Sequence, residues 1–305
     1  LCGQPQKNRF ISLKNDYHGE TLGALSVTDV AIFKQTYAPL LSPCVHVPTP
    51  DWRYAEPGES ASDYAIRAAA ALERHVAENH EQIAALILEP LVQGATGMGM
   101  YHPVYLQRAR EICNQYQIHM IADEIAVGFG RTGTLFACNQ ADIAPDFLCL
   151  SKGLSGGYLP LSVVMTTDTI YQAFYDDKIA HAFLHSHSHS GNALACRAAL
   201  ATLDIFEQNQ TIDANKIKAA YLNKIAAPLA AHPKVIDFRN CGMIWAFEVK
   251  TEDADFAATC FQAGLKQKLL LRPLGKTIYF MPPYIINEQE MDLLVSGTLQ
   301  ILDTL

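Results

Sequence analysis

The 305-residue sequence predicts an α/β protein, in which a mostly parallel sheet is covered by helices on both faces and is followed by a smaller α+β unit. Short, nearly continuous apolar segments alternate with longer segments of helical spacing, which is typical of a βαβ sheet buried on both faces. Beyond the last long helical segment, the pattern changes to helices mixed with strand pairs. The chain also exceeds one typical domain of about 150 residues, so two domains are expected.

The first part of the chain supplies the alternation. Residues 9–14 alternate apolar and polar side chains and predict a strand, and the Ala-rich segment 60–80, capped by Ser60, predicts a helix. Five further elements are expected: a strand at 84–88, a helix at 103–116, and strands at 119–122, 147–150 and 161–166.

A long helical pattern at 192–207 connects the two parts. We place the boundary near Phe206, which gives a large domain at 1–206 and a small C-terminal domain at 207–305. The small domain is expected to contain a helix, a strand pair, a helix, a second strand pair and a final helix at 288–301.

Composition excludes several classes of function. Half of the residues are hydrophobic and 18% are charged, which excludes a disordered chain. The formal net charge of -8 leaves no basic surface for nucleic acid or an anionic membrane, and no segment has the roughly 18 uninterrupted apolar residues of a membrane span. We therefore expect a soluble protein.

The eight cysteines are scattered, with no CxxC pair and no secretory leader ahead of them. This pattern predicts reduced cytosolic thiols, most of them buried. They are Cys2, Cys44, Cys113, Cys138, Cys149, Cys196, Cys241 and Cys260.

Polar residues follow several of the predicted strands, at the edge of the sheet where ligands bind in open α/β folds. Lys152 follows 147–150 and precedes the glycine-containing segment 153–157, whose glycines would let a ligand approach the backbone. Burial at that edge would disfavour the charged amine and leave a nucleophile able to form a Schiff base with an aldehyde.

Asp123 ends another predicted strand. A buried carboxylate needs a cationic partner, and a protonated pyridine nitrogen would provide one. A helix cap or a structural ion pair is the alternative interpretation.

Two segments, IADEIAVGFGRTG at 121–133 and LSKGLSGG at 150–157, form one long composite motif. With the segments 17–19, 89–94 and 272–276, this motif resembles the signature of class III, pyridoxal-phosphate-dependent aminotransferases over nearly the whole chain. The resemblance implies a fold type I transferase with a seven-stranded, mostly parallel sheet and pyridoxal 5'-phosphate as cofactor. It also implies a cytoplasmic homodimer with active sites at the subunit interface.

The resemblance also implies roles for individual cofactor-binding residues. Lys152 would form the Schiff base with the cofactor and move the proton, and Asp123 would keep the pyridine nitrogen protonated. Tyr17 would lie on or beside the cofactor ring, unless it is a core aromatic. Ser188 would bind the cofactor phosphate of the neighbouring subunit, at a position where relatives carry a threonine.

On the substrate side, Arg272 would bind a carboxylate through its bidentate fork. Tyr279 would line the same pocket, and Glu89 and Arg131 would lie near the cofactor as support. The alternatives are a surface arginine for Arg272, a core tyrosine for Tyr279 and structural ion pairs for Glu89 and Arg131.

Three features favour one subfamily: Ala126, where many relatives carry a glutamine, and the segments 98–103 and 272–284. The implied reaction is transfer of an amine from S-adenosylmethionine to 8-amino-7-oxononanoate, which gives 7,8-diaminononanoate in biotin synthesis. The alternatives are a class III enzyme acting on an ω-amino acid or using lysine as donor, and a non-catalytic remnant.

Two local features remain. Alternating histidines at 185, 187 and 189 would project to one face of a strand and could ligate zinc, but a polar loop is as plausible and we expect no metal. Relatives also carry a Gly-Ser phosphate cup ahead of the segment where this sequence begins. We therefore expect a fragment that binds the cofactor weakly when expressed alone.

Overall fold

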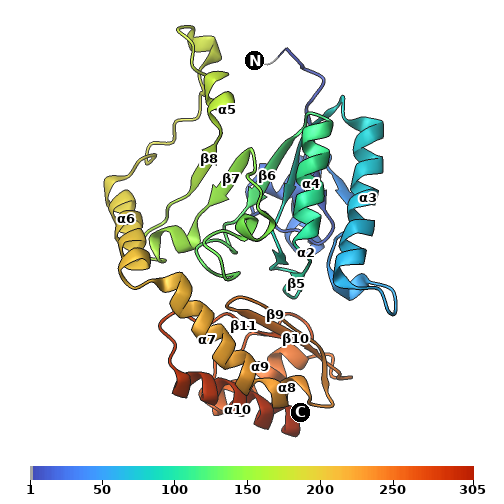
Figure 1. The fold of residues 1–305 in the computed structure, drawn as a ribbon, viewed down its shortest axis with the longest axis vertical. Coiled ribbons are helices and arrows are strands. Elements are labelled where there is room, and N and C mark those ends of the chain that lie inside the picture. Colours follow the sequence, from blue (N-terminus) through green and yellow to red (C-terminus); the bar gives the residue numbers. More distant parts are fainter. Residues whose placement is uncertain (1–2) are drawn as a thin grey trace.

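A six-stranded sheet forms the centre of the computed structural model, which describes residues 3–305 (Figure 1). The strand order is β2-β1-β3-β6-β7-β8, and all neighbours are parallel except β7 and β8. Its strands are β1 (Arg9–Leu13), β2 (Val45–Val47), β3 (Ile83–Leu88), β6 (His119–Asp123), β7 (Phe147–Leu150) and β8 (Val163–Thr166). The predicted mostly parallel α/β sheet is confirmed.

The expected number of seven strands is wrong for the described residues. The short strands β4 (Val92–Gln93) and β5 (Gly99–Met100) form a hairpin with each other instead of joining the sheet. Strand β2 joins the edge of the sheet although the sequence did not predict it, because three residues are too few to show a periodic pattern.

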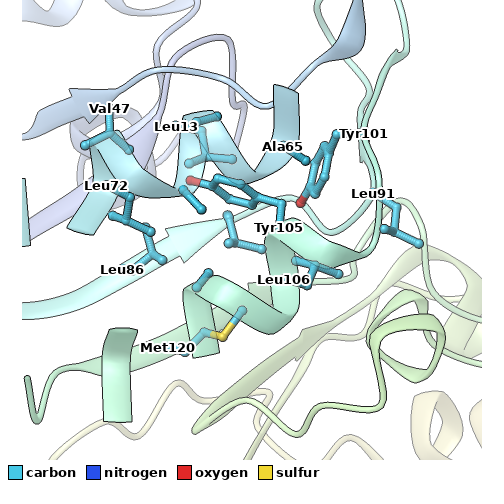
Figure 2. Close-up of a cluster of buried hydrophobic side chains, with 14 of the residues drawn as sticks. Leu13, Val47, Ala65, Leu72, Leu86, Leu91, Tyr101, Tyr105, Leu106 and Met120 are labelled. Atoms are coloured by element: carbon cyan, nitrogen blue, oxygen red, sulfur yellow. The ribbon is translucent and has the colours of Figure 1, made fainter. Parts of the chain in front are cut away.

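Helices α3 (Ala61–Asn79) and α4 (Val104–Gln115) pack side by side against the sheet (Figure 1). Helix α3 begins where the sequence predicts, because the Ser60 side chain accepts the Asp63 backbone N–H. Buried side chains from both helices meet those of β1, β3 and β6 (Figure 2). Two shorter helices, α1 (Leu22–Val27) and α2 (Ala31–Lys34), follow β1.

The C-terminal part has its own sheet and its own core, around Trp245 and Phe247. Helix α6 (Ala193–Gln208) leads into α7 (Thr211–Ile225) and α8 (Ala227–Ala230), and α9 (Phe256–Lys266) and α10 (Glu288–Thr304) complete the helices. The antiparallel strands β9 (Val235–Cys241), β10 (Ile244–Val249) and β11 (Thr277–Phe280) pair in the order β11-β10-β9. The predicted boundary at Phe206 falls in the last turn of α6, and the division into two domains stays a prediction.

The second predicted strand pair is wrong, because only β11 forms. Residues 269–273, which precede it, stay outside the sheet, and Pro273 has no N–H to donate to a ladder. A single bridge between Leu274 and Thr277 closes the turn into β11.

The segment 157–194 contains no buried residue. It carries β8 and α5 (Asp168–Gln172) and exposes large apolar side chains, among them Ile179 at 81% and Leu184 at 77%. Exposed apolar area of this extent is typical of an interaction surface. The structure also contains the 3-10 helices η1 (Gln35–Leu40), η2 (Trp52–Tyr54), η3 (Ala137–Ala141), η4 (Lys152–Ser155) and η5 (Ile179–His181).

Within residues 3–305, no helix has the length and apolar character needed to cross a membrane. The seven cysteines in this range are free thiols, and Cys2 lies outside the described residues. Three of the seven are buried, so the expectation that most are buried is wrong for this part of the chain. Cys44 and Cys149 are only half-buried because both line a surface hollow.

Candidate active site

A histidine lies between two carboxylates at the carboxyl end of the central sheet. His18 Nδ1 is 2.8 Å from Asp123 Oδ2, and His18 Nε2 is 3.5 Å from Asp16 Oδ2. The imidazole is 2% exposed. Burial lowers the pKa of His18, but the hydrogen bond to Asp123 and the charges of both carboxylates outweigh it and raise that pKa to about 10. His18 is therefore a buried cation at neutral pH, and it touches Asp123.

The turn after β1 brings His18 to this place. Gly19 has a φ of +119°, which a residue with a side chain rarely adopts. The His18 N–H donates to Thr28 Oγ1 (3.0 Å), and the Asp29 N–H donates to the Asp16 carbonyl (2.8 Å). The sequence placed Asp16 and His18 among the polar candidates that follow the first strand, but it assigned neither of them a role in the site.

Glu89 follows β3 and supports the same turn. Its carboxylate accepts the backbone N–H groups of Tyr17 (2.9 Å) and Gly94 (3.1 Å). Burial and the nearby charge of Asp16 raise the pKa of Glu89 to about 8. Glu89 forms no salt bridge with any described residue, so the ion-pair interpretation of Glu89 is wrong for this part of the chain.

Tyr17 is half-buried beside this cluster. Its ring centroid lies 4.8 Å from that of Phe33, and its hydroxyl donates to Glu20 (3.2 Å). One side of Tyr17 is thus packed, and its hydroxyl reaches an exposed carboxylate rather than the core.

Lys152 follows β7 and lines a cavity of about 550 Å³ with Ile125, Ala126 and Arg131. Its side chain is exposed, because the cavity opens to solvent. The expectation that burial removes water from the Lys152 amine is therefore wrong for this chain on its own. Its backbone φ is +44°, an unfavourable left-handed conformation for a residue with a side chain.

The glycines after Lys152 serve two purposes. Gly156 and Gly157 line the cavity, as the expected approach of a ligand requires. Gly153 instead makes room for a neighbouring side chain, because a Cβ there would lie 3.0 Å from Phe129 Cβ.

Arg131 connects the cavity to the C-terminal part of the chain. Its Nη1 donates to the Pro282 carbonyl (2.6 Å), and its guanidinium carbon lies over the Tyr284 ring. Burial lowers its pKa, and it forms no salt bridge within residues 3–305. The ion-pair interpretation of Arg131 is therefore also wrong for the described chain.

Arg272 and Tyr279 lie together in a second hollow, of about 630 Å³. Met281 and Pro283 line both this hollow and the cavity of Lys152, so the two spaces adjoin. Arg272 is exposed, and neither its hydrogen-bond nor its salt-bridge capacity is used by another described residue.

Asp123 lines a third hollow, of about 420 Å³, which shares Ile125 with the Lys152 cavity. Asp123 and Lys152 therefore line two hollows that meet at Ile125. Ser188 lies apart from them, exposed in the segment 157–194, and lines none of the three hollows.

The histidine repeat shows no metal-binding arrangement. The rings of His187 and His189 lie 5.6 Å apart on the exposed segment. Among the described residues, no three histidine, cysteine or acidic side chains gather closely enough to hold a metal ion.

The fold and the site place this chain among the aminotransferases. Residues 2–302 match the family described as Aminotransferase class-III, and the chain belongs to this family. The family resemblance seen in the sequence is confirmed.

Among curated proteins, the chain is similar to the adenosylmethionine-8-amino-7-oxononanoate aminotransferase of Helicobacter pylori, with 48% identity over 98% of this chain and 68% of that protein. The enzyme of the same name from Geobacter sulfurreducens is 38% identical over 97% of this chain. This chain spans about two thirds of the length of both relatives.

Solved structures agree on the fold. The omega transaminase of Pseudomonas jessenii in complex with PMP has a TM-score of 0.93 and 32% identity, covering 99% of this chain and 69% of that one. The adenosylmethionine-8-amino-7-oxononanoate aminotransferase of Methanocaldococcus jannaschii has a TM-score of 0.89 and 31% identity, with the same coverage. The predicted transaminase fold is confirmed.

Proposed function

We propose that this protein transfers an amine from S-adenosylmethionine to 8-amino-7-oxononanoate, with pyridoxal 5'-phosphate as cofactor. The observation that carries the proposal is that Lys152 and the His18–Asp123 pair line two hollows that share Ile125, at the carboxyl end of one sheet. The names of relatives up to 48% identical support the choice of substrates.

The residues present fit the cofactor. Asp123 keeps a fixed carboxylate, because Oδ2 contacts His18 and Oδ1 accepts the Ile125 N–H (3.1 Å). A carboxylate held in this way favours a protonated ring nitrogen. The Lys152 amine bonds to no other described side chain, so it is available to an aldehyde carbon. The similar omega transaminase of P. jessenii was solved in complex with PMP, the amine form of this cofactor.

Pyridoxal phosphate, when bound, supplies an aldehyde that accepts the amine and a ring that withdraws electrons from the carbon that loses a proton. This chain supplies the proton chemistry. Lys152 Nζ would take the proton from that carbon and deliver it to the former aldehyde carbon of the cofactor, and Asp123 would hold a proton at the ring nitrogen. Tyr17 would lie on or beside the ring.

The second hollow suits the acceptor. An oxononanoate has a carboxylate at the end of an apolar chain, and Arg272 offers a free guanidinium fork beside Tyr279. Met281 and Pro283 lie between this fork and Lys152, where the apolar chain would run.

We further propose a homodimer in the cytoplasm. The exposed apolar side chains of 157–194 support it, since they need a protein partner to leave water. Ser188 lies in this segment and would reach the cofactor phosphate of the neighbouring subunit. Free thiols at all seven described cysteines agree with a reducing compartment.

Reductive labelling tests the assignment of the amine. After incubation with pyridoxal phosphate and reduction with borohydride, mass spectrometry should find the pyridoxyl group on the peptide that contains Lys152. Lys276, whose Nζ donates to the Thr251 carbonyl (2.6 Å), is an internal control and should stay unlabelled. Labelling of Lys276 in place of Lys152 would overturn the assignment.

Donor profiling tests the substrate. The similarity to omega transaminases favours an ω-amine donor as the second candidate. Purified protein should form 7,8-diaminononanoate with S-adenosylmethionine and should use lysine or an ω-amino acid much more slowly. Faster turnover with either competitor would replace the proposed donor.

A further inference from the structure

A second carboxylate faces His18 from the side opposite Asp123. Asp16 is fully buried, and its Oδ2 lies 3.5 Å from His18 Nε2. Neither of these two atoms has a hydrogen-bond partner among the described residues. Buried polar atoms without a partner are costly, so these two atoms favour an ion pair with each other. A small decrease in their separation would turn this ion pair into a hydrogen bond.

A chain of buried hydrogen bonds holds Asp16 in place. The Gln93 amide donates to Asp16 Oδ1 (2.5 Å) and to the Lys14 carbonyl (2.8 Å). Thr49 Oγ1 in turn donates to Gln93 Oε1 (2.6 Å), which fixes the orientation of the amide. Gln93 is fully buried, and Thr49 is 6% exposed. The carboxylate is therefore aimed at His18 by groups that have no other task in the site.

The charges around His18 come from four elements. Asp16 belongs to its own turn, Asp123 to β6, Glu89 to the end of β3, and His46 to β2. One imidazolium cannot neutralise three carboxylates. Burial raises the pKa of both Asp16 and Glu89, but Asp16 faces a nitrogen of His18 at 3.5 Å and Glu89 contacts neither nitrogen, so Glu89 is the one that keeps a proton. Asp16 and Asp123 then share the single positive charge of His18.

We propose that Asp16 is a positioning residue, whose carboxylate holds the His18 imidazolium in the orientation that fixes the Asp123 carboxylate toward the ligand-binding edge of the sheet. In this arrangement Asp16 touches neither substrate nor cofactor and acts through His18. The inference rests on the proposed function for the importance of Asp123. The part that concerns His18, a positive charge held by Asp16, applies to the chain without any ligand.

Nitrogen NMR of the histidine rings tests this statement in the chain without cofactor. In the wild-type protein at pH 7.5, both ring nitrogens of His18, assigned by comparison with His18→Gln, should carry protons. In Asp16→Asn, which keeps the shape of the side chain and removes its charge, the titration midpoint of His18 should fall by about one to three pH units. Asp29→Asn is the matched control, because Asp29 follows in the same loop and faces His46 (3.7 Å) instead. It should leave His18 unchanged.

A cofactor titration gives the second readout. Asp16→Asn should bind pyridoxal phosphate about tenfold more weakly than the wild type and Asp29→Asn, and Asp16→Glu should recover part of the loss. A wild-type chain that binds pyridoxal phosphate too weakly to titrate would agree with the weak binding expected of this chain alone, and the NMR result would then decide the positioning role.

Two outcomes overturn the proposal. One is a neutral His18 in the wild-type chain at pH 7.5, which needs no variant and therefore holds even if Asp16→Asn does not fold. The other is a folded Asp16→Asn protein, with an unchanged circular dichroism spectrum, whose His18 titrates as in the wild type.

Discussion

The guanidinium carbon of Arg131 lies 4.3 Å from the centroid of the Tyr284 ring, and the Tyr284 hydroxyl donates to the Phe129 carbonyl (2.7 Å). Tyr284 thus connects the C-terminal part of the chain to two residues in the wall of the Lys152 cavity. Replacing Tyr284 with Phe should keep the ring contact and remove one hydrogen bond, at a cost of about 1 kcal/mol in the free energy of unfolding. A denaturant titration of the two proteins measures this difference in the free energy of unfolding. Tyr221→Phe, which loses an exposed bond to Asp292, should cost less.

Asp123→Asn should leave the fold intact and lower transamination at least about a hundredfold, because a neutral amide does not favour a protonated ring nitrogen. The amide oxygen can still accept the Ile125 N–H, but the buried His18 cation loses one of its two counter-charges, so the temperature of unfolding should fall. Turnover equal to that of the wild type would remove Asp123 from the reaction.

Arg272→Lys should raise the KM for the oxononanoate roughly tenfold or more, since a point charge replaces a planar fork worth about 1 to 3 kcal/mol. At this position, an effect on substrate binding can be distinguished from an effect on stability. Arg272 is exposed and unbonded within residues 3–305, so the free energy of unfolding should move by less than about 0.5 kcal/mol. An equal loss with a donor that has no carboxylate would contradict a carboxylate-binding role.

Glu89 should make stability depend on pH with a definite sign. Its carboxyl ionises near its ordinary pKa of 4.5 when unfolded and near 8 when folded. The folded state therefore holds one more proton between these values, and stability falls as the pH rises through that window. Glu89→Gln should show a smaller loss of unfolding free energy from pH 5 to pH 8. The pKa of His18 is raised from 6.5 to about 10, which lowers stability in the same direction above pH 6.5, so part of the slope should remain. The exposed substitution Glu81→Gln should keep the full wild-type slope.

Gly242→Ala should be strongly destabilising. Gly242 has a φ of +58°, and a Cβ there would lie 2.3 Å from the backbone of Gly133 and Thr132. Strain and overpacking together should cost about 2 to 4 kcal/mol. Gly275 is a matched control, because it has the same φ with nothing within 4 Å of its Cβ position. If both alanine variants lose the same stability, the close approach of the two loops does not matter.

Two strands of the central sheet, β3 and β7, are predicted from a continuous apolar segment, and β1 is predicted from the alternation of apolar and polar side chains. Burial on both faces leaves such a segment in the sequence, so Asp123 and Lys152 could be located at strand ends before any coordinates were known. Strand β2 has three residues and no such signature.

The buried contact between Asp16 and His18 could not be predicted in the same way. A polar turn after a strand resembles a solvated loop, and its burial depends on Gln93, 77 positions further along the chain. The bond from Arg131 to Pro282 spans 151 positions for the same reason. The local sequence pattern carries no information on such tertiary partners. For the same reason, the sequence overestimated the burial of the Lys152 side chain, which is exposed in this chain.

The left-handed backbone of Lys152 has a consequence for how this position can evolve. Glycine adopts a φ of +44° without strain, so at residue 152 local stability and chemistry favour different amino acids. If the lysine carries the reaction, as we propose, selection for activity retains it although a glycine at residue 152 would make the folded state more stable. A descendant released from that selection would be free to lose this amine and to become a more stable, inert relative.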